Sequence, residues 1–205
     1  MTQSTIIWLA ALMLTSVPTV PQTANTAAPI PQSASPAPPA AAAVSVTSTR
    51  DQLYIRLNGA WTGQLEYRDF QSDKHVALPT WLDIKTSPDG SSLQFTYTYD
   101  DGPSKILIEH STIKIDPANH QFMATSDRDH SSETYQISGL AEPLPAGRVQ
   151  FALSGKGTEN DKPVDVRITI TIGRNLYQYS KETRQAAEDF KFRDGYTFTR
   201  RNPPQ

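Results

Sequence analysis

Apolar and polar residues alternate along most of the chain after residue 50, as they do in β-strands that bury one face. The most regular run is 164–172, where Val and Ile alternate with Asp, Arg and Thr. The same alternation predicts strands at 61–68, 76–85, 93–100, 105–109, 112–116, 121–126, 134–140, 148–154, 176–183 and beyond the turn Asp194-Gly195. The pattern therefore predicts about ten strands.

The segments between these runs are short and contain turn signals such as Pro88-Asp89-Gly90 and Asp100-Asp101-Gly102. No helical segment is long enough for the crossover that parallel strands require, so we expect an antiparallel sheet. Sequential hairpins with one buried face favour an all-β, up-and-down barrel, which leaves no exposed sheet edge. A sandwich of two sheets is the alternative that the same pattern permits.

The first 24 residues have the features of a signal peptide. Residues 6–14 are continuously apolar, a length that suits a signal-peptide core and falls short of the ~20 residues needed to span a bilayer. Small residues follow, although no Lys or Arg precedes Arg50. We therefore expect export to the periplasm or the exterior. An uncleaved apolar N-terminus on a cytosolic protein is the alternative.

Residues 25–49 are rich in Ala and Pro and have no apolar periodicity. Prolines at this density lack amide donors and favour polyproline II over helix or sheet. The segment is therefore predicted to be a disordered spacer. The β-rich domain is predicted to occupy residues 50–205.

Both ends of the predicted sheet carry residues that resemble the calycin barrels, the superfamily of lipocalins and fatty-acid-binding proteins. Gly59-Ala60-Trp61 opens the first strand, and the last strand ends on Tyr196 to Arg201 with Phe198 between them. In such barrels a Trp packs across the closed end beneath a basic side chain of the last strand. The resemblance implies that Trp61 and Arg200 form this structural contact, and that the interior binds a ligand without catalysis.

Composition excludes several classes of protein. There are 19 basic and 21 acidic residues and a net charge of −2, so the basic patch of a nucleic-acid-binding protein is not expected. The absence of cysteine excludes disulfides, Cys-ligated zinc and thiol catalysis. Haem-binding calycins use a His near the end of the chain, whereas the last His here is His130. We therefore expect no metal and no cofactor.

The sequence carries no catalytic motif. We find no Gly-x-Ser-x-Gly elbow and no glycine-rich phosphate loop. Glu66, Asp100 and Asp101 would be candidates for a carboxylate pair, but the two aspartates lie where turns favour Asp for backbone reasons. We expect no enzymatic activity, with a hydrolase of unknown specificity as an alternative.

Aromatic residues on the predicted inward faces are the best indication of function. Apolar, largely pre-formed cavities with a few polar groups are typical of small-ligand sites. The predicted ligand-binding residues are Tyr67, Phe95, Tyr97, Phe151, Ile170 and Phe198. They would bind a small, apolar or amphipathic ligand. A filled core, in an envelope protein that acts through its surface, is the alternative.

Basic residues are concentrated in the last part of the chain, and they permit two interpretations. Several of them at one barrel mouth could bind a carboxylate or phosphate head group. Paired with nearby acidic residues, they would instead form an ordinary salt-bridged exterior. These residues are Arg167, Arg174, Lys181, Arg184, Lys191, Arg193, Arg200 and Arg201.

Overall fold

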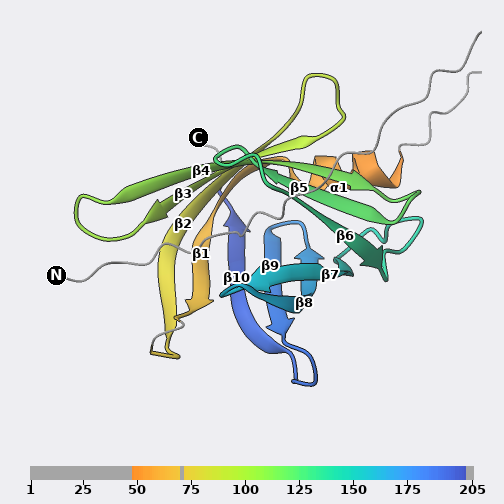
Figure 1. Ribbon diagram of the computed structural model, residues 1–205. Coiled ribbons are helices and arrows are strands. Elements are labelled where there is room, and N and C mark those ends of the chain that lie inside the picture. Colours follow the sequence, from red (N-terminus) through yellow and green to blue (C-terminus); the bar gives the residue numbers. More distant parts are fainter. Residues whose placement is uncertain (1–47, 70–71, 202–205) are drawn as a thin grey trace, which may run out of the picture.

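The structure is a computed structural model that describes residues 48–69 and 72–201. Ten antiparallel strands close into a single barrel in which each strand pairs with the next in sequence and β1 pairs with β10 (Figure 1). The prediction of an up-and-down barrel is confirmed, and the alternative of two separate sheets is wrong. The strands are β1 Gly59–Arg68, β2 His75–Thr86, β3 Leu93–Asp100, β4 Ile106–Asp116, β5 Gln121–Ser126, β6 Ser132–Ser138, β7 Val149–Glu159, β8 Lys162–Ile172, β9 Leu176–Arg184 and β10 Lys191–Arg200.

Three strands differ from the sequence prediction. β4 is one continuous strand instead of two, and β10 begins before Gly195 instead of after it. β7 continues five residues beyond Ser154 through a stretch with two glycines. Gly155 is inside the barrel because a Cβ there would lie 2.7 Å from the ring of Tyr135. The ring leaves no room for the apolar side chain that strict alternation predicts at this position.

The sequence pattern gave no indication of α1, the helix Thr49–Leu57 that precedes the barrel. Ser48 caps it by accepting a hydrogen bond from the backbone N–H of Asp51, whose carboxylate also favours the positive helix N-terminus. Leu53, Tyr54 and Leu57 form its buried face. Four apolar residues in nine, one of them the exposed Ile55, do not make a periodicity long enough to predict a helix.

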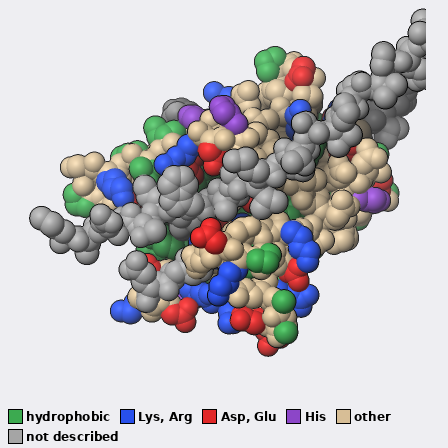
Figure 2. Space-filling model, in the orientation of Figure 1, with side chains coloured by type: hydrophobic (Ala, Val, Ile, Leu, Met, Phe, Trp, Pro, Cys, Tyr) green, Lys and Arg blue, Asp and Glu red, His purple; other side chains and the backbone are tan. Residues whose placement is uncertain are grey.

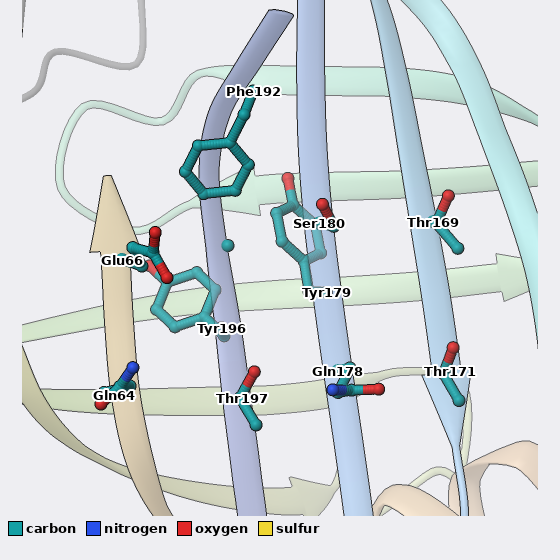
Figure 3. Close-up of a pocket in the computed structure, with 11 residues that line it drawn as sticks. Gln64, Glu66, Thr169, Thr171, Gln178, Tyr179, Ser180, Phe192, Tyr196 and Thr197 are labelled. Carbon is teal, nitrogen blue, oxygen red and sulfur yellow. The ribbon is translucent and has the colours of Figure 1, made fainter. Parts of the chain in front are cut away.

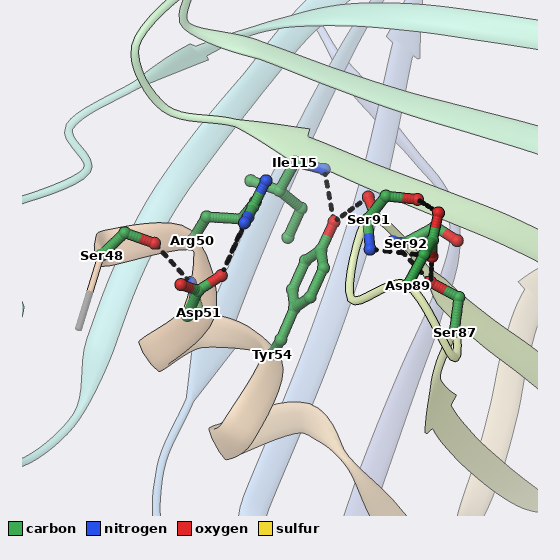
Figure 4. Close-up of polar contacts among 9 residues, drawn as sticks. All are labelled: Ser48, Arg50, Asp51, Tyr54, Ser87, Asp89, Ser91, Ser92 and Ile115. Atoms are coloured by element: carbon green, nitrogen blue, oxygen red, sulfur yellow. Dashed lines mark hydrogen bonds and ion pairs between the residues drawn. The ribbon is translucent and has the colours of Figure 1, made fainter.

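Helix α1 lies across one end of the barrel, which we call the closed end. The hydroxyl of Tyr54 donates to the carbonyl of Ser91 and accepts from the backbone N–H of Ile115, both at 3.2 Å (Figure 4). Arg56 donates to two carbonyls of the loop between β6 and β7. These contacts join the helix to three separate segments of the barrel.

Trp61 and Arg200 fasten the helix to the first and last strands. Trp61 is completely buried and donates through Nε1 to the carbonyl of Leu57 at 2.9 Å. The guanidinium of Arg200 lies over the indole, with Cζ 4.1 Å from the ring centroid. It also donates to the carbonyls of Arg56 and Asn58 at the helix C-terminus, where positive charge is favoured. This is the contact that the sequence analysis expected.

The predicted signal peptide and the spacer up to residue 47 lie outside the described residues. The helix starts at Thr49, the last residue assigned to the spacer. Within the described ranges, no helix is long and apolar enough to cross a membrane.

Candidate functional site

The barrel interior consists of two parts with different chemistry. The part next to α1, which we call the closed half, is apolar and tightly filled. Here Tyr177 packs against the rings of Trp61 and Phe95 and stacks on Phe198, with centroids 6.0–6.3 Å apart. Four of the predicted ligand-binding residues belong to the buried core, each exposing 3% of its surface or less: Phe95, Phe151, Ile170 and Phe198. All four pack against other core side chains.

The remaining part of the interior, which we call the open half, is polar and aromatic. By strand alternation its side chains point into the barrel on the same faces as the closed-half residues. The open half comprises Tyr97, Tyr99, Glu109, Glu133, Tyr135, Glu159, Lys181, Tyr179, Arg193, Asp194 and Tyr196. Of the predicted ligand-binding residues, Tyr97 belongs to this group, and Tyr67 lies directly opposite Asp194 on β1.

A cluster of tyrosine rings separates the two halves. Tyr196 lies 5.2 Å from Tyr97 and 5.8 Å from Tyr179, centroid to centroid, and stacks on Phe198 below it. The hydroxyls of Tyr196 and Tyr99 are 3.0 Å apart. Tyr97, Tyr179 and Tyr196 are only partly buried, although their side chains point inward. Solvent therefore reaches these rings from the open half.

Burial raises the pKa of Tyr97, Tyr179 and Tyr196 well above the ordinary phenol value, and nearby Asp194 raises each of them further. All three phenols therefore remain protonated and can donate hydrogen bonds. The hydroxyls of Tyr97 and Tyr179 make no hydrogen bond to any described residue. Both residues are partly exposed, so these hydroxyls are accessible for contact with a bound molecule.

Lys181 and Asp194 form the charged centre of the open half. They are directly opposite each other on β9 and β10. Burial raises the pKa of Asp194, and the charges of Lys181 and Arg193 partly offset that effect. Lys181 exposes only 9% of its surface. Within residues 48–69 and 72–201, neither side chain has a hydrogen bond or an ion pair within 4 Å.

The rim of the open half is held by a second charged group. A bulge between Phe192 and Asp194 turns Arg193 inward, where it forms an ion pair with Glu159 of β7 at 3.1 Å. Glu159 also accepts from the hydroxyl of Thr183 at 3.0 Å. Arg193 further donates to the carbonyl of Arg68. Arg193 and Glu159 therefore have charged and hydrogen-bonding partners, unlike Lys181 and Asp194.

Two more carboxylates face the open half. Glu133 accepts from the hydroxyl of Tyr135 at 2.5 Å, and Glu109 accepts from Tyr99 at 3.4 Å. Glu109 is also 3.9 Å from Arg128, an exposed residue of the β5–β6 turn. Glu133 has no cation beside it in the part of the chain that the structure describes.

Tyr67, the sixth predicted ligand-binding residue, lies on β1 opposite Asp194. It is partly exposed. Burial raises its pKa, and the charges of Asp101 and Asp69 raise it further. The register places Tyr67 at the level of Asp194, and among the described residues no ring contact joins it to the tyrosine cluster.

A separate groove of about 300 Å³ lies on the outer face of β1, β10, β9 and β8. Figure 3 shows its Thr, Ser and Gln side chains along these strands, with Phe192 and Glu66 at one end. Gly195 also lines the groove. A Cβ at this position would lie 2.8 Å from the carbonyl oxygen of Tyr179, so only glycine fits here. The groove is lined by both polar and apolar surface, and its chemistry is that of an ordinary solvated sheet face.

The late basic residues divide between the two interpretations of the sequence. Arg167 and Arg184 are exterior, pair with Glu182 and Asp165, and both lie over the ring of Phe190. Acidic and basic side chains are interspersed in this region (Figure 2). Lys181 and Arg193 instead point into the barrel, whereas Arg200 belongs to the closed end.

Most of the open half was missed by sequence analysis, although its signal was present. Lys181 and Asp194 sit on the inward-facing register of their strands, where alternation predicts apolar residues. A charged residue at such a position indicates a functional site more strongly than an aromatic one does. No group of His, Asp and Glu suited to a metal ion occurs among the described residues.

Comparisons with known proteins support the fold. No family model matches the chain, and no curated protein matches it significantly. Among solved structures, Rv2717c from M. tuberculosis is similar with a TM-score of 0.54 and 14% sequence identity, covering 77% of this chain and 100% of its own. A DUF3598-family protein of unknown function from Nostoc punctiforme has a TM-score of 0.41 and 18% identity, covering 72% of this chain and 48% of its own. The similarity to Rv2717c concerns the fold alone.

Proposed function

We propose that this protein is an exported, calycin-like barrel that binds a small amphipathic molecule in its open half and releases it unchanged. The observation that carries the proposal is the pair Lys181 and Asp194. Both are held inside the barrel without a hydrogen bond to a described residue, beside tyrosine rings that solvent can reach.

Physical cost makes this arrangement informative. Lys181 exposes only 9% of its surface, and an ionised side chain with so little contact with water and no hydrogen bond to a described residue is disfavoured. Such groups are retained mainly where a ligand or a reaction uses them. The tyrosine rings offer flat apolar faces to the body of a ligand, and the charged pair and free hydroxyls offer contacts to its polar end. The filled closed half serves as the floor on which the tyrosine cluster rests.

Adjacent residues on β9 provide a matched test. The side chain of Tyr179 is on the same inward register as Tyr177, whereas Gln178 points into the outer groove, which the backbone of Tyr179 also borders (Figure 3). The probes are 4-phenylbutylamine, 4-phenylbutanamide and 4-phenylbutanoate, which share a body and differ in their polar end. We expect at least one to bind saturably by calorimetry, and Tyr179→Leu to weaken it while Gln178→Ala does not.

Thermal melting of each variant establishes that it is folded, and Tyr179→Phe provides a version that retains the ring packing. Saturable binding lost in Tyr179→Leu alone would support the proposal. If none of the three probes binds at concentrations up to about 1 mM, or if Gln178→Ala is the damaging variant, the open half is not the binding site.

A further inference from the structure

The charges of the open half are unbalanced, and this imbalance restricts the chemistry of the ligand. Four carboxylates point into it, from Glu109, Glu133, Glu159 and Asp194, against the two cations of Lys181 and Arg193. The pair Arg193 and Glu159 is joined at 3.1 Å. Lys181 and Asp194 face each other across neighbouring strands.

The two cations offset only two of these four charges, and Glu133 and Glu109 are the carboxylates that neither Lys181 nor Arg193 faces. Glu109 has Arg128 nearby, at 3.9 Å on the exterior. Glu133 receives only the neutral hydroxyl of Tyr135. Its charge contributes to raising the pKa of both Tyr179 and Asp194, so it acts on the centre of the open half. The excess charge at this centre is therefore negative.

The tyrosine rings also favour a positively charged ligand. The face of an aromatic ring is the negative end of its quadrupole, and several rings around one point attract alkylammonium groups. Tyr97, Tyr179 and Tyr196 are partly exposed and lie in the same half as Glu133 and Asp194. An anion placed here would meet both the carboxylates and the ring faces.

A buried side chain without a partner gives independent evidence that a ligand completes this site. Lys181 is nine-tenths buried, points into the open half, and has no hydrogen bond to a described residue. An acceptor atom on the ligand, next to its cationic group, would satisfy Lys181 while the cation lies toward Glu133. Asp194 on β10 lies beside Lys181 on β9, and Glu133 on β6 is four strands from β10 in the order around the barrel.

We infer that the ligand of the open half is an amphipathic organic cation, with an ammonium group toward Glu133 and Asp194 and an apolar or aromatic body on the tyrosine cluster. This inference rests on the proposed function. It names the charge of the ligand, which the binding proposal leaves open.

The test compares the three phenylbutyl probes by calorimetry on the wild-type chain and two variants. We expect the amine to bind at least tenfold more tightly than the amide, and the acid to bind most weakly. Glu133→Gln should reduce the affinity for the amine about tenfold and leave the affinity for the amide unchanged. The matched control is Glu66→Gln, which removes the same charge from the outer groove and should change neither affinity.

The outcomes separate the inference from the proposal beneath it. If the amide or the acid binds as tightly as the amine, or if Glu133→Gln leaves the affinity for the amine unchanged, the inference is wrong and open-half binding stands. If no probe binds, both are wrong. Asp194→Asn is a second variant for the case in which Glu133→Gln does not fold, and the same loss of amine affinity is expected.

Discussion

The two halves of the barrel interior treat polar groups in opposite ways. In the closed half every polar group of the fastening contact has a partner: Trp61 donates to Leu57, and Arg200 donates to carbonyls of the helix. In the open half, Lys181 and Asp194 face each other without hydrogen bonds. The difference separates residues that stabilise the fold from residues whose placement costs stability, as expected of a functional site.

Helix α1 explains how one barrel can contain both halves. A small barrel is filled by its own side chains, whereas a larger one leaves room for a ligand. Here the helix adds Leu53, Tyr54 and Leu57 to the interior at one end only. The closed half is thereby filled, and the opposite end keeps the polar groups of its own strands.

A pair of truncations gives the largest expected effect. Removing residues 1–57 deletes three buried side chains of the closed half, each comparable to a core truncation of about 2–5 kcal/mol. We expect this chain to lose most of its stability or to be unfolded, as measured by circular dichroism during heating.

The matched control removes residues 1–47 and keeps the helix and its Ser48 cap. Its melting temperature should stay within a few degrees of that of the full chain. Equal melting temperatures for the two truncations would mean that α1 does not close the barrel.

The fastening contact itself should give the next largest effect. We expect Trp61→Ala to lower the free energy of unfolding by about 3–5 kcal/mol, because a completely buried aromatic is lost. Arg200→Ala should cost less. Because the two side chains are in contact, the double variant should lose less than the sum of the two single losses. Strictly additive losses in urea denaturation would show that they do not stabilise each other.

Most of the barrel could be predicted from the sequence, because alternation with period two records which face of each strand is buried. The prediction failed where packing or a bulge overrides that pattern. Gly155 stands where the ring of Tyr135 leaves no room for a side chain, and the bulge at Arg193 extends β10 before Gly195. Helix α1 is short, and only its contacts with the barrel end identify its buried face.

The candidate site was predicted less well than the fold. Choosing aromatic residues on inward faces included Phe95 and Phe198, which the structure places in the buried core. Alternation shows which face of a strand is inward, but not how far along the barrel a residue lies. The polar half is assembled from single charged residues on different strands, such as Glu133 and Lys181. Their proximity depends on the register around the closed barrel, which the sequence does not specify.

The charge of Asp194 in the open half gives a third prediction, in which a substitution raises the stability instead of lowering it. Burial raises the pKa of Asp194, so its ionisation is less favourable in the folded protein than in the unfolded chain. The resulting penalty is absent below the ordinary value of 3.8 and fully present above the raised pKa. Asp194→Asn should therefore melt at a higher temperature than wild type near pH 7, with the difference vanishing near pH 3.

Asp165 on the exterior is the control for this prediction. Hydrogen bonds from Lys156 and Arg184 lower its pKa, so its ionised form stabilises the fold above the ordinary value, and this contribution is lost as the pH falls. Asp165→Asn should lower the melting temperature near neutral pH. If Asp194→Asn also lowers the melting temperature near neutral pH, the charge of Asp194 does not destabilise the fold. That result would contradict the difference between the two halves.

Hydroxyl deletions give the smallest expected difference between the halves. Tyr54 makes two hydrogen bonds in the closed half, so Tyr54→Phe should cost about 1–3 kcal/mol. Tyr179 makes none to a described residue, so Tyr179→Phe should change the free energy of unfolding by less than about 0.5 kcal/mol. Equal costs, measured by urea denaturation, would contradict the division.

Fluorine NMR of the protein labelled with 3-fluorotyrosine tests the central claim most directly, because the eight tyrosines report on both halves. Assignments come from single Tyr→Phe variants. On titration with 4-phenylbutylamine, we predict shifts for Tyr97, Tyr179 and Tyr196, and unchanged signals for Tyr54 and Tyr177. Shifts confined to Tyr54 and Tyr177, or no shift in any signal, would contradict a filled closed half and a ligand-binding open half.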